Sequence, residues 1–351
     1  MDLIYNGQAQ GSVAATLLGN GFDVAALRPW IGQDGQHYIA RNQAGKMVAA
    51  PTLTRNATLR KDEWKILDEA VVAAAKDRLR IVADLRSAGL SYNIPNGMAK
   101  TVLDTEKQSD ITGAIISMDP ARKAEGDRPE YELVSLPLPV IHKDFSFNAR
   151  QIAVSRNGST PLDTTMAQLA ARRVSEEAEK LALGTTGTFS YGGGTIYGLT
   201  NFPQRITRSL THPTQSNWTP AICVDEILAM RQDSMDALHY GPWVLYTSPS
   251  WDLYLDADYS ATKGDNTLRD RIKKINGIQD VRTADYLSGY QMLLVQQTSD
   301  VIRMVVGMDI TTVQWETEGG MKLNFKVMAI MVPQIRADYN GNTGLVHGTA
   351  A

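Results

Sequence analysis

The sequence predicts a mixed α+β protein in which helices cover a sheet. Two long segments, at about 62–88 and 161–184, place apolar residues three and four positions apart, as in an amphipathic helix. A third segment, at about 311–331, alternates in the way that long strands do. With 351 residues, 43% of them apolar, the chain can fill one large core or two ordinary ones.

Residues 1–60 are predicted to form an N-terminal arm. Their short apolar segments are separated by Gly, Gln and Asn, Pro29 and Pro51 interrupt them, and neither a helical nor a strand period persists. A flexible tail is the alternative interpretation of this composition. The opening MDLIYNGQAQGS lacks the basic flank and continuous apolar stretch of a signal peptide, so we expect a soluble protein that is not secreted.

The first helix is predicted from Asp62 to about Ala88. Asp62 can cap its start, and Gly89 can end it. The charged residues of its opposite face indicate contact with solvent. Its apolar face consists of Trp64, Leu67, Val71, Ala75, Leu79 and Val82.

Residues 105–140 are predicted to form a long charged hairpin with a polar tip. Turn signals around Asp119–Pro120 and Gly126–Pro129 separate two extended runs. The apolar content is thin, and an isolated two-stranded ribbon is at best marginally stable in water. We therefore expect this hairpin to need a neighbour on which to lie.

A strand-like stretch, VIHKDFSFNARQIAV, leads into the second helix. Thr160 can cap this helix, Pro161 suits its first turn, and Asp163 favours its positive end. The helix is expected to run to about Leu183 and to stop at Gly184, which makes it about 34 Å long. The following GTTGTFSYGGGTIYG has no lysine and follows a helix, so it fails the pattern of a phosphate-binding loop and is predicted to be a connecting loop.

From Thr219 onward, helices and strands alternate. The pattern predicts a capped helix reaching Leu238, a buried strand at PWVLYTS, and a helix in the 251–255 region. Two further strands, YQMLLVQQ and VIRMVVGMDI, precede the long strands at 311–331. This part is predicted to be a compact α/β domain whose last strands leave its layer.

Composition and motifs argue against catalysis, metal binding and a dedicated nucleic-acid role. Charged residues make up 21% of the chain, the net charge is -3 and the pI is about 6.0. No hydrolase nucleophile motif is present, and no histidine stands at metal-ligand spacing from another His, Cys or carboxylate. We therefore expect no enzyme activity, no metal and no cofactor. The histidines are His37, His142, His212, His239 and His347.

Cys223 is the only cysteine, which excludes an internal disulfide. A lone cysteine is most often a buried apolar side chain, and its isolation fits assembly in a reducing compartment. No apolar run approaches the roughly 18 residues that suggest a membrane span, so no membrane partner is expected.

The order of these elements resembles that of the tailed-phage major capsid proteins with the Hong Kong 97 fold, and most closely their encapsulin (linocin-type) branch. The resemblance covers roughly residues 60 to 340, and the fixed order of the motifs is its specific part. The segments that carry it are EWKILDEAVVAAAKDRL, LPVIHKDFSFNARQI, PLDTTMAQLAARRVSEEAEKLALG followed by IYGL, GPWVLYTSPSWDLYL, and VVGMDITTVQWETEGGMKLNFKVMAIMVP.

The resemblance implies a division of the chain into capsid elements. In this division the hairpin is the E-loop that lies over a neighbouring subunit, and the long helix at 161–184 is the spine helix of the peripheral domain. The implied boundaries are 1–60 for the N-terminal arm, 61–104 for the N-terminal helix and start of the peripheral domain, 105–140 for the E-loop, 141–195 for the peripheral domain with its spine helix, 196–300 for the axial domain, 301–332 for long strands returning to the peripheral domain, and 333–351 for a C-terminal tail at the axial domain.

The implied function is that of a major capsid protein, which assembles as hexamers and pentamers into an icosahedral shell around double-stranded DNA. Portal, scaffold and decoration proteins are implied as further partners, and the virion capsid, assembled in the host cytoplasm, as the location. Encapsulins usually begin near the first helix, so the sixty-residue arm favours a phage capsid over an encapsulin-type compartment. An unrelated α+β enzyme is the third interpretation. Lys107 and Lys123 lie where some relatives form covalent cross-links, but no partner asparagine is identifiable, and no cross-link is predicted.

A basic cluster is the one site expected to contact the packaged DNA. It lies where the arm meets the first helix, and in a capsid it could face the lumen and neutralise phosphates. An intersubunit salt-bridge patch is the alternative. The cluster consists of Arg55, Arg60, Lys61 and Lys65.

Overall fold

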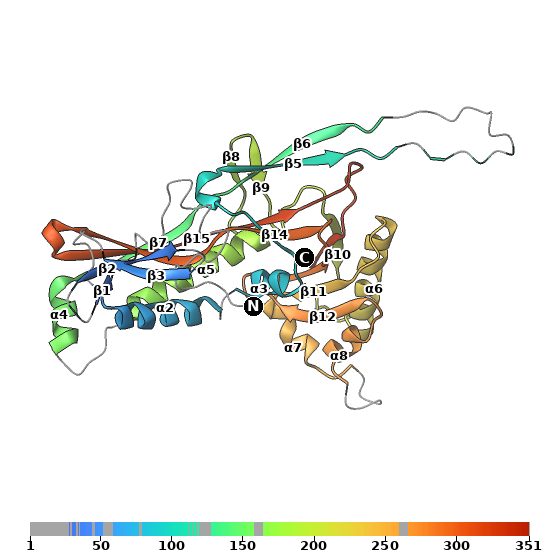
Figure 1. Cartoon of the computed structure of the whole chain (residues 1–351). Coiled ribbons are helices and arrows are strands. Elements are labelled where there is room, and N and C mark those ends of the chain that lie inside the picture. The colour runs from blue at the N-terminus through green and yellow to red at the C-terminus, as the bar shows by residue number, and fades with distance from the viewer. Residues whose placement is uncertain are drawn as a thin grey trace. The chain divides into compact units, whose positions relative to one another are not determined.

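The computed structural model shows a mixed α+β chain whose residues divide into two compact units (Figure 1). Unit 1 comprises Met1–Thr101, Leu138–Ala182 and Met304–Pro333; unit 2 comprises Val102–Pro137, Leu183–Arg303 and Gln334–Ala351. The residues that the structure describes are 28, 30–32, 34, 36–43, 46–51, 59–76, 79–111, 113–114, 116, 118, 128–157, 164–259 and 266–350.

Unit 1 is built on a four-stranded sheet with the order β4-β14-β15-β7. β15 pairs with β7 antiparallel, and the short β4 pairs with β14 in parallel. The long β14 and β15 confirm the strands predicted at 311–331. The bounds of the sheet are β4 Ser91–Asn93, β7 Ile141–Asn148, β14 Ile302–Thr317 and β15 Lys322–Ile335, with the short helix η1 at Gly97–Ala99 and η3 at Glu318–Gly320 between the long strands.

The core of unit 1 is centred on Phe325, which is fully buried on β15. Its ring stacks on Phe145 with centroids 5.1 Å apart and meets Phe147 edge-on at 5.6 Å. Trp64 of α2 (Lys61–Lys76) approaches the same ring at 6.0 Å, also edge-on. These contacts attach the first helix to the sheet through aromatic packing.

The single helix predicted from 62 to 88 is wrong, because α2 is followed by a separate helix, α3 (Arg80–Ser87). The reason lies far along the chain. Glu179 of α5 (Thr165–Leu183) is buried, and its carboxylate accepts the backbone N–H of Ile81 at 2.7 Å and that of Val82 at 3.4 Å. It thus supplies partners for donors that the first turn of a helix leaves unsatisfied. Gly89 ends α3 with a φ of +75°, as predicted.

Only the first part of the strand-like stretch at 140–154 forms a strand. β7 ends at Asn148, and the helix α4 (Ala149–Asn157) follows directly. The Gln151 side chain accepts the backbone N–H of Asn148 at 3.0 Å, close to the start of that helix. The second long helix, α5, ends at Leu183, as predicted. Gly184 follows it with a φ of +86°. The predicted cap at 160–163 lies outside the described residues.

Part of the predicted arm forms regular structure, so the expectation of no strand in residues 1–60 is wrong for residues 30–51. There a three-stranded antiparallel sheet runs in the order β1-β2-β3, and Gln43 of β2 pairs with Lys46 of β3. Several of its residues are alanines or short polar residues, which hide the strand alternation. Residues 1–27 lie outside the described part. The strand bounds are β1 Trp30–Ile31, β2 His37–Gln43 and β3 Lys46–Pro51.

Unit 2 contains a five-stranded mixed sheet with the order β10-β16-β13-β11-β12. The strands β11 and β13 confirm the predictions for PWVLYTS and YQMLLVQQ, whereas β10, β12 and β16 were not predicted. Their bounds are β10 Ile206–Leu210, β11 Trp243–Thr247, β12 Ile278–Thr283, β13 Tyr290–Gln296 and β16 Leu345–Ala350.

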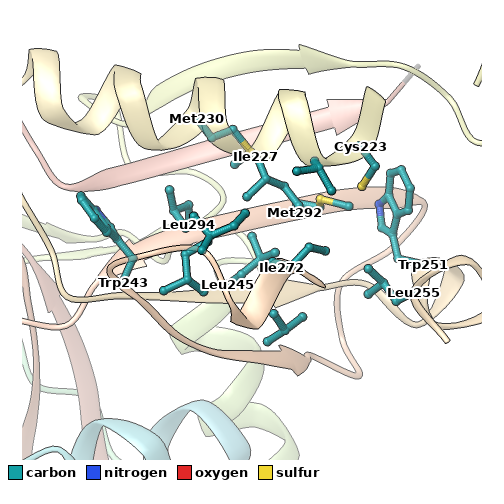
Figure 2. Packing of buried hydrophobic residues seen from close by; sticks show 14 of the residues in the cluster. Cys223, Ile227, Met230, Trp243, Leu245, Trp251, Leu255, Ile272, Met292 and Leu294 are labelled. Carbon is teal, nitrogen blue, oxygen red and sulfur yellow. The ribbon is translucent and has the colours of Figure 1, made fainter. Parts of the chain in front are cut away.

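Three helices pack on one face of this sheet and enclose an apolar cluster (Figure 2). α6 (Pro220–Asp236) begins as predicted, because the Thr219 hydroxyl accepts the backbone N–H of Ile222 at 3.4 Å. Figure 2 shows Trp243 at one end of the cluster and Trp251 at the other. The other two helices are α7 Asp252–Leu255 and α8 Leu268–Lys273, and the short 3-10 helix η2 Pro249–Trp251 leads into α7.

Two hairpins complete unit 2. The predicted charged hairpin has a paired stem of β5 (Val102–Gln108) and β6 (Tyr131–Pro137). The glycine-rich segment, predicted to be a connecting loop, instead forms a second hairpin of β8 (Phe189–Tyr191) and β9 (Gly194–Ile196). Gly192 and Gly193 form its turn with φ of +59° and +80°, a conformation that glycine adopts without strain. Among the described residues, no helix is long and apolar enough to cross a membrane.

Candidate subunit-contact surfaces

The stem of the β5–β6 hairpin exposes one face that mixes acidic and apolar side chains. Glu106 stands opposite Leu133, and Gln108 stands opposite Tyr131. Tyr131 is 62% exposed and Leu133 63% exposed, although both are large and apolar. On the other face, the pair Leu103 and Leu136 is buried at the base of the stem. The stem is therefore anchored at its base and uncovered further out.

Three contacts within unit 2 hold this hairpin: one midway along its stem, one just beyond the outermost pair of the stem and one near its base. The Gln334 amide donates to the Thr105 hydroxyl at 3.3 Å, and the Tyr339 hydroxyl donates to the Glu130 carboxylate at 3.1 Å. That hydrogen bond raises the pKa of Tyr339, because it stabilises the protonated phenol. The third contact is steric: a Cβ on Gly194 would lie 2.1 Å from the Ser135 carbonyl oxygen, so β9 approaches β6 as closely as only glycine allows.

We expect Gly194→Ala to displace the hairpin base and to destabilise unit 2 by about 1–3 kcal/mol, since the clash is with backbone. Hydrogen exchange at residues 131–137 should become faster, and the thermal midpoint should fall. Gly113→Ala is the matched control, because nothing lies within 4 Å of a Cβ at that position. Equal behaviour of the two variants would contradict the close-packing role of Gly194.

The predicted basic cluster is only partly described. Arg55 lies outside the described residues, and Lys61 begins α2. Arg60 is exposed just before α2 and donates its backbone N–H to the Glu63 carboxylate at 2.8 Å. Lys65 is exposed on the helix and pairs loosely with Glu69 at 3.8 Å. Three of the four residues therefore gather at the start of α2, with acidic residues interspersed among them.

Sequence reasoning missed a buried ion pair beside this cluster. The Arg28 guanidinium donates to both oxygens of Asp68 at 2.6 and 2.5 Å, and it lies 4.4 Å from the Trp64 ring centroid. Burial lowers the pKa of Arg28 and raises that of Asp68, while their mutual attraction opposes both shifts. The pair attaches Arg28, which precedes β1, to α2. No local sequence pattern indicates this pair, because its two residues are 40 positions apart.

The structure also places a buried histidine in unit 2. Nδ1 of His347 accepts the Arg205 Nε–H at 3.2 Å, and its Nε2 lies 3.3 Å from Oε1 of the Gln291 side chain. Burial, reinforced by the positive charge of Arg205, lowers the pKa of His347 to about 4. The His347 imidazole is therefore neutral in the folded protein near neutral pH.

We expect this histidine to make unit 2 less stable in acid. Its stabilising contribution is fully present above its ordinary pKa of 6.5 and is lost as the pH falls through the folded value of about 4. Between pH 7 and pH 4.5 the loss amounts to roughly 2 kcal/mol. Urea unfolding at the two pH values should show a smaller difference for His347→Gln than for the wild type. An identical pH dependence in the two proteins would contradict this assignment.

The single cysteine of the chain lies in the core of unit 2. Cys223 is buried, as predicted, and burial raises the pKa of its thiol to about 12. Such a thiol is a poor nucleophile near neutral pH. Among the described residues, no group of three or more His, Cys, Asp and Glu side chains could hold a metal ion.

Solved structures with the same fold are capsids and related particles. A virus-like particle from Pyrococcus furiosus matches with a TM-score of 0.58 at 16% identity, covering 81% of this chain and 98% of that chain. The capsid of Myoviridae phage XM1 matches with a TM-score of 0.58 at 11% identity, covering 76% and 91%. The capsid of an empty GTA particle matches with a TM-score of 0.56 at 12% identity, covering 78% and 91%.

These likenesses show that the chain has the Hong Kong 97-like capsid fold, as the resemblance implied. No curated protein matches the sequence. The chain belongs to the family of unknown function DUF6260, whose profile matches residues 52–348.

Proposed function

We propose that this protein is the major capsid subunit of a tailed bacteriophage, which assembles into an icosahedral shell around double-stranded DNA. The observation that carries the proposal is a capsid-fold chain whose hairpin exposes large apolar side chains outside its own core. Covering one such side chain contributes about 1.5–3 kcal/mol, and a shell covers it in every subunit. We assign the hairpin to contact with a neighbouring copy.

The capsid elements follow from this proposal. Unit 1, with α5 and the long strands, is the peripheral domain, and the segment from 196 to 300 with the C-terminal tail is the axial domain. The division at Arg303 and Met304 supports this assignment, because it falls within three residues of the expected start of the returning strands at 301. Subunits would gather as hexamers and pentamers, with portal, scaffold and decoration proteins as further partners.

We assign the start of α2 to the lumen of the shell. Arg60, Lys61 and Lys65 would contact the packaged DNA through its phosphates, without sequence preference. The acidic residues around them and the net charge of -3 limit this to a local contact. The proposed location is the virion capsid, with assembly in the host cytoplasm.

An encapsulin-type compartment is the second candidate, favoured by the 98% of the Pyrococcus particle chain that this chain covers. The contents of the particle distinguish the two. A phage capsid is expected to hold nucleic acid and to be encoded beside a portal and a terminase. A compartment is expected to hold a protein such as a peroxidase or a ferritin-like cargo.

The test is electron microscopy of the purified protein, together with sedimentation and the absorbance ratio of the particle fraction. Closed shells of uniform size support the proposal. A monomer or dimer that forms no shells under any assembly condition would contradict both the capsid and the compartment assignments. It would favour the third interpretation, an unrelated α+β enzyme.

A further inference from the structure

One buried histidine connects three neighbouring strands of the unit 2 sheet. His347 lies near the middle of β16, where it pairs with Thr207 of β10 on one side and with Leu293 of β13 on the other. Its side chain is only 6% exposed. The ring nitrogens follow the same arrangement, because Nδ1 contacts Arg205, which directly precedes β10, and Nε2 contacts Gln291 of β13. The ring therefore joins β16 to both of its neighbours.

The hydrogen bonds of this ring require one tautomer. A guanidinium is always protonated and only donates, so Nδ1 of His347 accepts the Arg205 Nε–H and carries no proton. Nε2 then carries the ring proton and donates it to Oε1 of Gln291 at 3.3 Å. Arg205 also donates to the Phe202 carbonyl at 2.9 Å, which holds the guanidinium in place. A second proton on the ring would therefore be directed at a fixed donor.

Protonation of the ring has opposite effects on its two sides. At Nδ1, two donors and two positive charges meet over the 3.2 Å that separates this nitrogen from the Arg205 Nε. At Nε2, the charged ring donates to Gln291 more strongly than the neutral ring does. Acid therefore weakens the contact of β16 with β10 and preserves its contact with β13.

Among the described residues, Arg205 is the charged group that acts on this ring. Burial and then the Arg205 charge lower the pKa of His347 to about 4. The residues beside it on β10 and β13, Thr207 and Leu293, are uncharged. The helix α6 packs on the opposite face of the sheet, because Val346, the preceding residue of β16, belongs to the apolar cluster that α6 covers.

β10 is the strand that can separate from β16. It lies at one edge of the sheet, and β16 is its only strand partner in the described part of the chain. Only Leu210 of its five residues is buried, so separation exposes little apolar surface. Two contacts keep the strand beside α6. The Arg208 guanidinium donates to the Asp233 carboxylate at 2.5 Å, and the Thr211 backbone N–H donates to the Glu226 carboxylate at 2.7 Å.

We propose that His347 is an acid-sensitive switch that separates β10 from β16. At neutral pH the neutral ring joins the two strands through Arg205. A proton on Nδ1 breaks that contact and frees β10, while β16 stays paired with β13. The edge of β16 that faced β10 then has unpaired backbone N–H and C=O groups. The switch is a property of the subunit and does not depend on the proposed shell function.

Hydrogen exchange of the full-length, dispersed subunit at several pH values tests the switch. The rates are first corrected for the pH dependence of exchange in an unfolded chain. The protection of residues 206–210 should then fall by roughly thirtyfold between pH 7 and pH 4.5, because the released ring regains its ordinary affinity for protons. The protection of residues 243–247 in β11 should stay nearly constant, since β11 remains paired with β12 and β13.

Three variants identify the group that responds to acid. His347→Gln should make the protection of residues 206–210 nearly independent of pH, because an amide accepts from Arg205 and takes up no proton. This variant keeps the two carboxylates of α6 that hold β10. Arg205→Gln should also weaken the pH dependence, since its amide oxygen accepts the added ring proton. His212→Gln is the matched control in the same unit, because the His212 ring contacts Thr214 and should leave the profile unchanged.

The pattern of protection decides between the switch and its alternatives. A wild-type pH dependence in His347→Gln would overturn the proposal and assign the effect to another group, such as the α6 carboxylates. Equal loss of protection in β10 and β11 would mean that acid unfolds unit 2 as a whole. If His347→Gln does not fold, a wild-type profile in Arg205→Gln contradicts the switch. A wild type that forms no particles would remove the proposed shell function and leave this measurement unaffected.

Discussion

A subunit in which Asn-Gly replaces residues 109–130 is expected to fold and to form no shells. β5 and β6 remain paired up to Gln108 and Tyr131, and a two-residue Asn-Gly turn suits the twist of the strands that it joins. The stem is thus kept, while the distal hairpin, including the fully exposed Ile116 and Met118, is removed. The described residues of the replaced segment lie outside the core, and the variant loses the exposed hydrogen bond from Tyr339 to Glu130. We therefore expect the main effect of the replacement on assembly and only a small effect on folding.

Two measurements separate folding from assembly in this variant. The thermal midpoint of the dispersed subunit should stay within about 4 °C of the wild type, which corresponds to roughly 1 kcal/mol. The particle fraction in sedimentation and electron microscopy should fall at least roughly a hundredfold, the effect of about two lost apolar contacts per subunit. Normal shells from the shortened subunit would show that the hairpin does not join neighbours.

Point variants on the stem refine the same test. Tyr131→Ser and Leu133→Ser keep the hairpin length and remove only the apolar side chains of its exposed face. Glu132 is exposed on the opposite face, so Glu132→Ser is the matched control and should assemble normally. Equal losses from all three changes would show that assembly does not depend on the apolar side chains of this face in particular.

The second large effect is expected from Phe325→Ala, which should destabilise unit 1 by about 3–5 kcal/mol. The ring is fully buried and contacts Phe145, Phe147 and Trp64, so its removal leaves a cavity bordered by three aromatic side chains. Backbone hydrogen bonds between β15 and β7 limit how far that cavity can collapse.

Urea unfolding followed by circular dichroism measures this loss. Phe189→Ala is the control, because Phe189 is a phenylalanine on a strand that is largely exposed, and its removal should cost less than about 1 kcal/mol. A loss from Phe325→Ala as small as that of the control would contradict the position of this ring at the centre of the unit 1 core.

The elements that the sequence predicts well are those whose signals are local. Thr219 caps α6 as its position before Pro220 indicates, and Gly89 and Gly184 end helices with positive φ. The break between α2 and α3 could not be predicted, since the Glu179 carboxylate that receives the N–H groups of α3 lies 98 positions away. A helical period continues across such a break without any change.

The candidate surfaces were predictable to a smaller extent. The hairpin was found because a thin apolar ribbon between turn signals is locally unusual. The basic cluster was predicted from its sequence alone, and its contact with DNA stays a prediction. The Arg28–Asp68 pair and the fit of His347 to Arg205 join distant positions, 40 and 142 apart. The positive φ of Leu238, just after α6, could not be predicted, because this leucine fits the helical period of the residues before it.

The dependence of α3 on Glu179 orders events during synthesis of the chain. α3 is too short to be stable alone, and its buried cap is added by the ribosome 98 residues later, which takes about 5–20 s at bacterial and eukaryotic rates. The strands β14 and β15 that complete the unit 1 sheet follow only after most of unit 2 has been made. β16, which pairs with both β10 and β13 in the unit 2 sheet, is made last of all. Neither unit can therefore complete its sheet, and no shell-forming surface that needs both units can appear, until nearly the whole chain has emerged.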